Sequence, residues 1–323
     1  MIYRKLGKWG VRISALGMGT DMNLGDRCDE AMSREMVRLA YEAGVNYFDT
    51  ANGYGNGNAE TMLGKCLADY PRNELFVLTK VGGRWREGPN ASGLSAKHIR
   101  ESCDESLQKL GMDYVDVLMC HRPDPNTPLE ETVRAMNDLI RSGKVLYWGV
   151  SNWPAGLLAK TKAVARALGA REVAVNEPRY NLVYRSPEAL IFPTTRAEGI
   201  GNVTFSPLGH GLLAGIYKPG QAPPSGSRAA VDGQNPVTRG LYFREDRIQK
   251  AQEFTGIADE LGVQAAELAI AWVMRQPDVT SCILGAWRPE ELALDLKAAA
   301  LSIPDDVLAK LDKLFPPPLI PTV

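Results

Sequence analysis

The run Tyr114-Val115-Asp116-Val117-Leu118-Met119-Cys120 and the segment after it, residues 127–143, decide the fold of this 323-residue chain. The run is almost continuously apolar, which is typical of a parallel strand buried on both faces. In the following segment apolar residues recur at steps of three and four, at Leu129, Val133, Met136 and Ile140. That spacing predicts an amphipathic helix, so the two segments together predict one strand-then-helix unit.

The predicted helix has recognisable ends. Thr127 is placed to cap the N-terminus, Pro128 suits the first helical position, and Glu130 lies three residues after Thr127, as in a capping box. Gly143 follows the last turn and provides a stop.

The same unit repeats along the chain. Predicted strands cover residues 14–18, 47–49, 76–80, 114–120, 145–150, 173–176, 202–205 and 281–284. Eight strand-helix units in this length, without a Gly- or Ser-rich linker, predict an α/β fold of the (β/α)8 TIM barrel type, a single domain over residues 1–323. We prefer this barrel to a two-domain, doubly wound fold. Residues 3–5 and 11–13, joined by a turn at 7–10, predict a hairpin before the barrel.

Two segments depart from the repeat. Residues 206–246, after the seventh strand, are rich in Gly and Pro, and so long a stretch is typical of a binding loop or lid. Residues 316–323 form a Pro-rich tail that cannot continue a helix and should run extended.

Composition excludes several classes of protein. With 37 Lys and Arg against 38 Asp and Glu, the net charge is -1 and no basic block suggests a nucleic-acid partner. An apolar run of the ~20 residues that a membrane span needs is missing, and the first residues do not resemble a secretory signal, so we expect a cytoplasmic protein. Five scattered cysteines outline neither disulfides nor a zinc site, and we expect no metal.

Four titratable residues of different types follow or end predicted strands: Asp49, Tyr54, Lys80 and His121. Barrel enzymes carry their catalytic groups at this end of the strands. An ammonium beside a phenol lowers the pKa of that phenol, and a carboxylate can hold the buried ammonium, so these residue types suit proton donation. Singly, each residue is equally consistent with capping or packing; together they predict a site.

At these residues the sequence resembles the aldo-keto reductase family. The match runs through Asp49-Thr50-Ala51-x-x-Tyr54-Gly55, then Leu78-Thr79-Lys80-Val81, and then residues 114–117 leading into His121-Arg122. Residues 122–136 and Tyr147-Trp148-Gly149 resemble the branch that includes beta subunits of voltage-gated potassium channels. The resemblance implies reversible hydride transfer between a nicotinamide cofactor and an aldehyde or ketone, with Tyr54 as proton donor, Asp49 and Lys80 tuning it, and His121 orienting the substrate.

The resemblance also implies a cofactor site. Ser151 and Asn152 match a pair that holds the nicotinamide carboxamide, Tyr180 matches an aromatic that stacks on the ring, and Arg228 falls where a phosphate-contacting arginine occurs. The full implied set is Gly19, Thr20, Asp49, Ser151, Asn152, Glu177, Tyr180, Ser206, Pro207, Leu208, Gly209, Gly211, Arg228, Gly285, Arg288, Glu291 and Asp295. On this basis residues 206–246 are interpreted as a cofactor loop.

Three of these positions depart from the family pattern. Glu177, Glu291 and Asp295 are carboxylates where amides are usual. Extra negative charge at Glu291 and Asp295 should disfavour a 2′-phosphate, although Arg288 is placed to offset it. We expect NADP(H), the family default, with NAD(H) as the alternative.

The substrate and partners are less sharply defined. Pocket residues are predicted at Met22, Asn23, Tyr54, Trp85, His121 and Arg122, for a small carbonyl or sugar-like substrate. The resemblance implies a homo-oligomer. It also leaves open an alternative function, a nicotinamide-binding regulatory subunit of a channel or other complex with slow or no turnover. In the channel subunits an asparagine is typical at the position of His121, so the histidine favours a reductase.

Overall fold

Eight parallel strands close into a barrel in the computed structural model, which describes residues 1–84, 86–231 and 235–319. The neighbours run β10-β3-β4-β5-β6-β7-β8-β9, so the first and last barrel strands pair with each other. The strands are β3 (Leu16–Gly19), β4 (Tyr47–Asp49), β5 (Phe76–Val81), β6 (Val115–Cys120), β7 (Val145–Ser151), β8 (Val175–Glu177), β9 (Gly201–Thr204) and β10 (Val279–Leu284). The predicted (β/α)8 barrel is confirmed.

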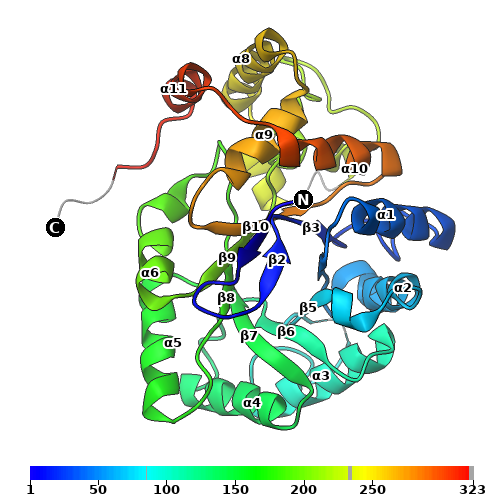
Figure 1. The fold of residues 1–323 in the computed structure, drawn as a ribbon, viewed down its shortest axis with the longest axis vertical. Helices are drawn as coiled ribbons and strands as arrows, with labels where there is room; N and C mark the ends of the chain where they lie inside the picture. Colours follow the sequence, from blue (N-terminus) through cyan, green and yellow to red (C-terminus); the bar gives the residue numbers. More distant parts are fainter. Residues whose placement is uncertain (85, 232–234, 320–323) are drawn as a thin grey trace.

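Helices surround the strands on the outside (Figure 1). They are α1 (Glu30–Glu42), α2 (Asn58–Leu67), α3 (Ala96–Leu110), α4 (Leu129–Arg141), α5 (Ala155–Ala167), α6 (Ile191–Glu198), α7 (Arg228–Val231), α8 (Glu245–Leu261), α9 (Ala265–Met274), α10 (Pro289–Asp295) and α11 (Asp305–Leu314). Shorter turns are η1 (Tyr54–Gly57), η2 (Arg72–Glu74), η3 (Ser186–Glu188), η4 (Leu212–Ala214), η5 (Thr238–Tyr242) and η6 (Leu296–Ala300).

Side chains alternate between the barrel interior and the helix layer, because successive residues of a strand point to opposite faces. The interior is filled by an apolar cluster that includes Tyr47, Leu78, Met119, Val175 and Val203. Two places after each of these interior residues, the next inward-facing side chain lies nearer to the carboxyl end of the barrel. Those residues are Asp49, Lys80, His121, Glu177 and Phe205. The fold thereby gathers them at one end.

A hairpin covers the opposite end of the barrel. It pairs β1 (Tyr3–Lys5) with β2 (Arg12–Ser14), as predicted, and Leu6 and Ile13 join the interior cluster. The backbone N–H of Lys8 donates to the carbonyl of Gly199, just before β9 begins. Two strands begin two residues later than predicted: Ser14 belongs to the hairpin, so that the first barrel strand begins at Leu16, and the strand predicted from residue 173 begins at Val175.

The start of α4 also differs from the prediction. Its N-cap residue is Pro128, and the Thr127 hydroxyl donates to Oδ2 of Asp124 at 2.7 Å instead of capping the helix. The same Asp124 oxygen accepts the backbone N–H of Leu94, which lies just before α3. Asp124 thus takes the Thr127 hydroxyl in place of the predicted capping box and joins the start of α4 to the segment before α3.

The two irregular segments differ from each other. The described part of residues 206–246 contains η4, α7 and η5, so short helical turns interrupt the predicted loop. The tail is anchored at its start, where Arg185 donates to the Phe315 carbonyl at 2.7 Å. Residues 316–319 form no regular structure and Leu319 is 95% exposed, whereas 320–323 lie outside the described residues.

Candidate active site

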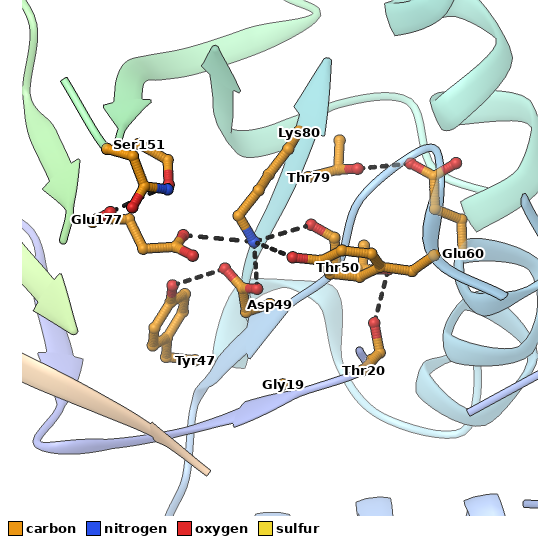
Figure 2. A network of polar contacts seen from close by, with 12 residues as sticks. Gly19, Thr20, Tyr47, Asp49, Thr50, Glu60, Thr79, Lys80, Ser151 and Glu177 are labelled. Atoms are coloured by element: carbon orange, nitrogen blue, oxygen red, sulfur yellow. Dashed lines mark hydrogen bonds and ion pairs between the residues drawn. The ribbon is translucent and has the colours of Figure 1, made fainter. Parts of the chain in front are cut away.

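The centre of the site is the Lys80 ammonium at the carboxyl end of β5. Its side chain is completely buried and hydrogen-bonds to Oδ1 of Asp49, at the end of β4. Nζ also lies 3.3 Å from Oε2 of Glu177 on β8 and 3.4 Å from the Thr50 carbonyl (Figure 2). Burial lowers the pKa of Lys80, but the Asp49 and Glu177 carboxylates outweigh it and the net shift is upward. Lys80 is therefore a fixed positive charge.

The Asp49 carboxylate is held from two sides. Lys80 binds one oxygen, and the phenol of Tyr47 donates to the other at 3.0 Å. Tyr47 was missed from the sequence, although it lies two residues before Asp49 on the same inward face. Both carboxylate oxygens of Asp49 are therefore hydrogen-bonded, which fixes its orientation against the ammonium.

Tyr54 lies next to this pair, at the start of η1. Its phenol oxygen is 3.4 Å from Lys80 Nζ. The Lys80 charge lowers the pKa of Tyr54, as expected, but burial raises it by more, so the net shift is upward. The reason is that desolvation of the phenolate exceeds the attraction of one ammonium already shared by two carboxylates. The phenol is neutral and can donate its proton.

His121 completes the group of four. Its ring centroid is 5.6 Å from that of Tyr54, and the two planes meet at 80°. Burial lowers the pKa of His121 to about 3, and the Lys80 and Arg122 charges add to the decrease. The imidazole is neutral at physiological pH, so it is able to hydrogen-bond but carries no charge.

Glu177 connects this cluster to Ser151 and Asn152. The Ser151 hydroxyl donates to the Glu177 carbonyl at 3.0 Å, and the Asn152 amide donates to Ser151 Oγ at 2.8 Å. Asn152 adopts a left-handed backbone with φ of 58°, which is uncommon outside glycine and marks a constrained position. Polar groups able to bind an amide thus lie side by side at the ends of β7 and β8.

Gly19 and Thr20 end β3 within the same region. A Cβ at Gly19 would lie 2.6 Å from Cγ2 of Ile283, so only glycine fits between β3 and β10. The Thr20 hydroxyl donates to that of Thr50 at 2.8 Å, and both side chains are buried. These residues shape the backbone of the site.

The ring of Tyr180 is not at the barrel mouth. It is 1% exposed, stacks on Trp272 at 5.2 Å and meets Phe192 edge-on, and its hydroxyl donates to Glu188. Tyr180 lies three residues after Glu177, and its side chain points into the helix layer. Phe205, just after β9, is a partly exposed aromatic residue that packs on the interior cluster. Sequence reasoning missed Phe205.

The turn after Phe205 carries the next predicted residues: Ser206, Pro207, Leu208, Gly209 and Gly211. Ser206, Gly209, His210 and Gly211 all have positive φ, which produces a tight, irregular turn. The Arg179 and Arg228 charges both lower the pKa of His210, after burial, so both guanidinium groups lie near this turn. Arg228 Nη1 also lies 3.4 Å from Asp21.

The last predicted motif forms its own network. Glu291 accepts from the Arg288 guanidinium at 2.6 Å and from the Trp287 N–H at 3.0 Å. Arg288 thus balances the Glu291 charge directly, and Gly285 precedes it in an exposed position. Asp295 is 5% exposed, and burial together with Glu291 raises its pKa to about 7.

The predicted pocket residues separate into different environments. Asn23 is fully buried, and its amide donates to the carbonyls of Gly19 and Ala286, so it joins β3 to the segment after β10 instead of lining a pocket. Met22 is half-buried with φ of 60°, and Arg122 is exposed beside His121. Trp85 lies outside the described residues.

Among the helices described, none has the length and apolar character that crossing a membrane requires.

Comparisons with known proteins agree with this geometry. The model of the aldo/keto reductase family matches residues 15–315. A protein of Arabidopsis thaliana, named as a probable voltage-gated potassium channel beta subunit, is 41% identical over 92% of this chain and 91% of its own length. One of the same name from Oryza sativa is 40% identical with the same coverage. A Schizosaccharomyces pombe protein, also named for a channel beta subunit, is 35% identical over 97% of this chain and 93% of its own.

Proposed function

The chain belongs to the aldo/keto reductase family, whose members are oxidoreductases, and from that premise we propose that it reduces an aldehyde or ketone reversibly with NAD(P)H. The observation that carries the proposal is the neutral Tyr54 phenol, 3.4 Å from a Lys80 ammonium that Asp49 fixes in place. A buried phenol beside a fixed positive charge can give up a proton to a carbonyl oxygen as negative charge develops there.

Each residue has a distinct part in the proposed reaction. Tyr54 donates its proton to the substrate oxygen, and Lys80 stabilises the phenolate that remains. Asp49, held by Tyr47, keeps the ammonium oriented. The neutral His121 ring, next to Tyr54, directs the carbonyl oxygen toward the phenol. The bound nicotinamide supplies the hydride.

The residues near the barrel mouth fit such a cofactor. Asn152 and Ser151 suit a carboxamide, Phe205 offers an aromatic face in place of the Tyr180 ring, and Arg179 and Arg228 lie by the turn at 206–211. Nε of Arg179 is buried without a hydrogen-bond partner, which suits an anionic group. We propose that residues 1–323 form one domain in which the 206–246 segment covers the phosphates.

NADP(H) is the proposed cofactor, and NAD(H) is the alternative. Arg288 already neutralises Glu291, so the Glu291 charge opposes a 2′-phosphate less than expected. We further propose a cytoplasmic homo-oligomer. All five cysteines are free and buried, which suits the reducing conditions of the cytoplasm. Size-exclusion chromatography with light scattering measures the number of subunits.

Replacing Tyr54 by Phe tests the proposed reduction. Purified protein is assayed with an activated aromatic aldehyde and NADPH or NADH, following loss of the reduced nicotinamide. Tyr54→Phe should lower kcat by ~10²–10⁴-fold, because the proton donor is lost while the ring remains. Unchanged turnover in the variant would contradict the role of Tyr54. The rate ratio of the two cofactors reports the preference.

A second candidate function is a nicotinamide-binding regulatory subunit, suggested by the names of the three relatives. It predicts saturable cofactor binding with slow or absent turnover, and association with a channel or other complex. The retained His121 favours the reductase instead.

A further inference from the structure

The Lys80 ammonium has one more carboxylate neighbour than its charge can balance. It hydrogen-bonds to Asp49 and lies 3.3 Å from Glu177, and no side chain of the three is more than 4% exposed. With both carboxylates ionised, this buried cluster would hold an uncompensated negative charge, which is strongly unfavourable away from water. One of the two acids therefore carries a proton.

Glu177 is the acid that the contacts single out. Asp49 accepts hydrogen bonds from both Lys80 and the Tyr47 phenol, and such bonds favour the ionised form. Oε2 of Glu177 faces the same ammonium but makes no hydrogen bond. Burial and the Asp49 charge raise the pKa of Glu177 by more than Lys80 lowers it.

The groups that face Glu177 come from three other elements. They are Asp49 and Tyr47 on β4, Lys80 on β5 and Tyr54 on η1. Lys80 is the cation among them, and it lies between the carboxyl group and the phenol. The separation from Nζ is 3.3 Å to Glu177 Oε2 (Figure 2). The separation from Nζ to the Tyr54 phenol oxygen is 3.4 Å.

We propose that Glu177 stores a proton beside Lys80 and passes it, through the ammonium, to the Tyr54 phenolate that each reduction leaves. This proposal rests on the proposed function. Lys80 gives one proton to the Tyr54 oxygen and takes one from Glu177, so the ammonium is regenerated. An O–H bond breaks at Glu177 and another forms at Tyr54, and Glu177 regains its proton from solvent after product leaves. Glu177 acts on the reaction only through Lys80, so it is a positioning residue and not a catalytic one.

The stored proton can be tested first in the protein without cofactor. Glu177→Gln has the same shape as the protonated acid but does not titrate. Unfolded glutamate ionises above about pH 4.5 while folded Glu177 keeps its proton, so the wild type should lose stability relative to Glu177→Gln as pH rises from 5 to 8. The ratio of their unfolding equilibrium constants should change by up to ~10-fold per pH unit.

Glu172→Gln is the matched control. Glu172 also contacts a buried lysine, Lys162, at 2.7 Å, but its pKa is lowered to about 2, so it stays ionised from pH 5 to 8. Its thermal midpoints should run parallel to those of the wild type. If the midpoints of Glu177→Gln run parallel as well, the proposal is overturned.

Two further readouts separate the proton store from the reaction. The infrared difference spectrum of wild type minus Glu177→Gln at pH 8 should contain one protonated carboxyl band, whereas the band from Asp295, whose pKa is about 7, occurs in both proteins and cancels. A difference spectrum without a protonated carboxyl band overturns the store. Glu177→Gln should also lower kcat about 10-fold and change its pH profile. A reductase whose kcat and pH profile are unaffected by Glu177→Gln overturns the relay but keeps the proposed function. Absent turnover in wild type removes the function, while the thermal and infrared results still decide the store.

Discussion

Two lysine side chains, Lys80 and Lys162, are completely buried at opposite ends of this barrel, and they are paired in different ways. Lys80 points into the barrel interior at the carboxyl end and faces two carboxylates that are each 4% exposed. Lys162 lies on α5 and contacts Glu172, which is 17% exposed, and the Glu198 carbonyl at the end of α6. Equal burial of the lysines therefore does not mean equal environments.

The difference lies in the surrounding charges. Glu172 also binds Lys8 at 2.5 Å and Arg166 at 2.8 Å, so cations are in excess around Lys162, whose pKa burial lowers. Around Lys80 two carboxyl groups, Asp49 and Glu177, face one ammonium, and the pKa of Lys80 is raised. At the end near the hairpin, Lys162 connects α5 to Glu172 and to the end of α6. At the carboxyl end, Lys80 lies beside the phenol of Tyr54.

The largest expected effect comes from removing each lysine in turn. Lys80→Met should lower kcat by ~10²–10⁴-fold, because the Tyr54 phenolate loses its counter-charge. Lys162→Met should leave kcat unchanged and lower the free energy of unfolding by ~1–3 kcal/mol, since the Glu198 carbonyl loses its donor. Steady-state assays and chemical denaturation measure both. A loss of kcat in Lys162→Met would remove the distinction between the two ends.

Acid should unfold the two ends in different pH windows. His121 and His210 have pKa values lowered to about 3, below the unfolded value of 6.5, so their stabilisation is lost as pH falls from about 6.5 toward 3. Each contributes up to ~1.4 kcal/mol per pH unit. Glu172, with a pKa lowered to about 2, loses its contribution only below about 4.5.

Stability curves against pH check these windows. His121→Asn should reduce the loss between pH 6.5 and 4.5, whereas Glu172→Gln should reduce it only below pH 4.5. The same window for both variants would contradict the assignment of these charge states.

The smallest expected effect concerns Lys8, which is 45% exposed and bound to Glu172. Lys8→Ala should change the free energy of unfolding by only ~0–1 kcal/mol, because solvent screens an exposed ion pair and Arg166 remains on Glu172. A loss as large as that from Lys162→Met would show that the exposed and buried partners of Glu172 act as one unit.

Much of the fold and the centre of the site follow from local patterns. Apolar runs and helical stripes predict the barrel, and the rule that polar residues gather at the carboxyl ends of strands selects Asp49, Lys80 and His121. Successive side chains of a strand point to opposite faces. Applied strictly, this rule predicts that Phe205, two residues after Val203, points into the barrel. It also predicts that Tyr180, three residues after Glu177, points away from the barrel interior.

Other features depend on contacts between distant segments. Asp124, which accepts the Thr127 hydroxyl, also accepts the backbone N–H of Leu94 from the segment before α3. Glu177 is recognisable in the sequence as an unusual carboxylate, but its approach to Lys80 spans the barrel interior, since β6 and β7 separate β5 from β8. The upward shift of the Tyr54 pKa likewise requires the burial that only the closed barrel provides.

Closure of the barrel also depends on the order in which the strands are synthesised, because the first barrel strand pairs with the last one. Leu16 on β3 pairs with Cys282 on β10, and Asn23 joins the carbonyls of Gly19 and Ala286 across that seam. A ribosome adding roughly 5–20 residues per second needs tens of seconds to make the missing partner. During that interval the exposed edge of β3 has no native neighbour on that side. The nascent chain should therefore depend on chaperones most strongly just before residue 282 emerges.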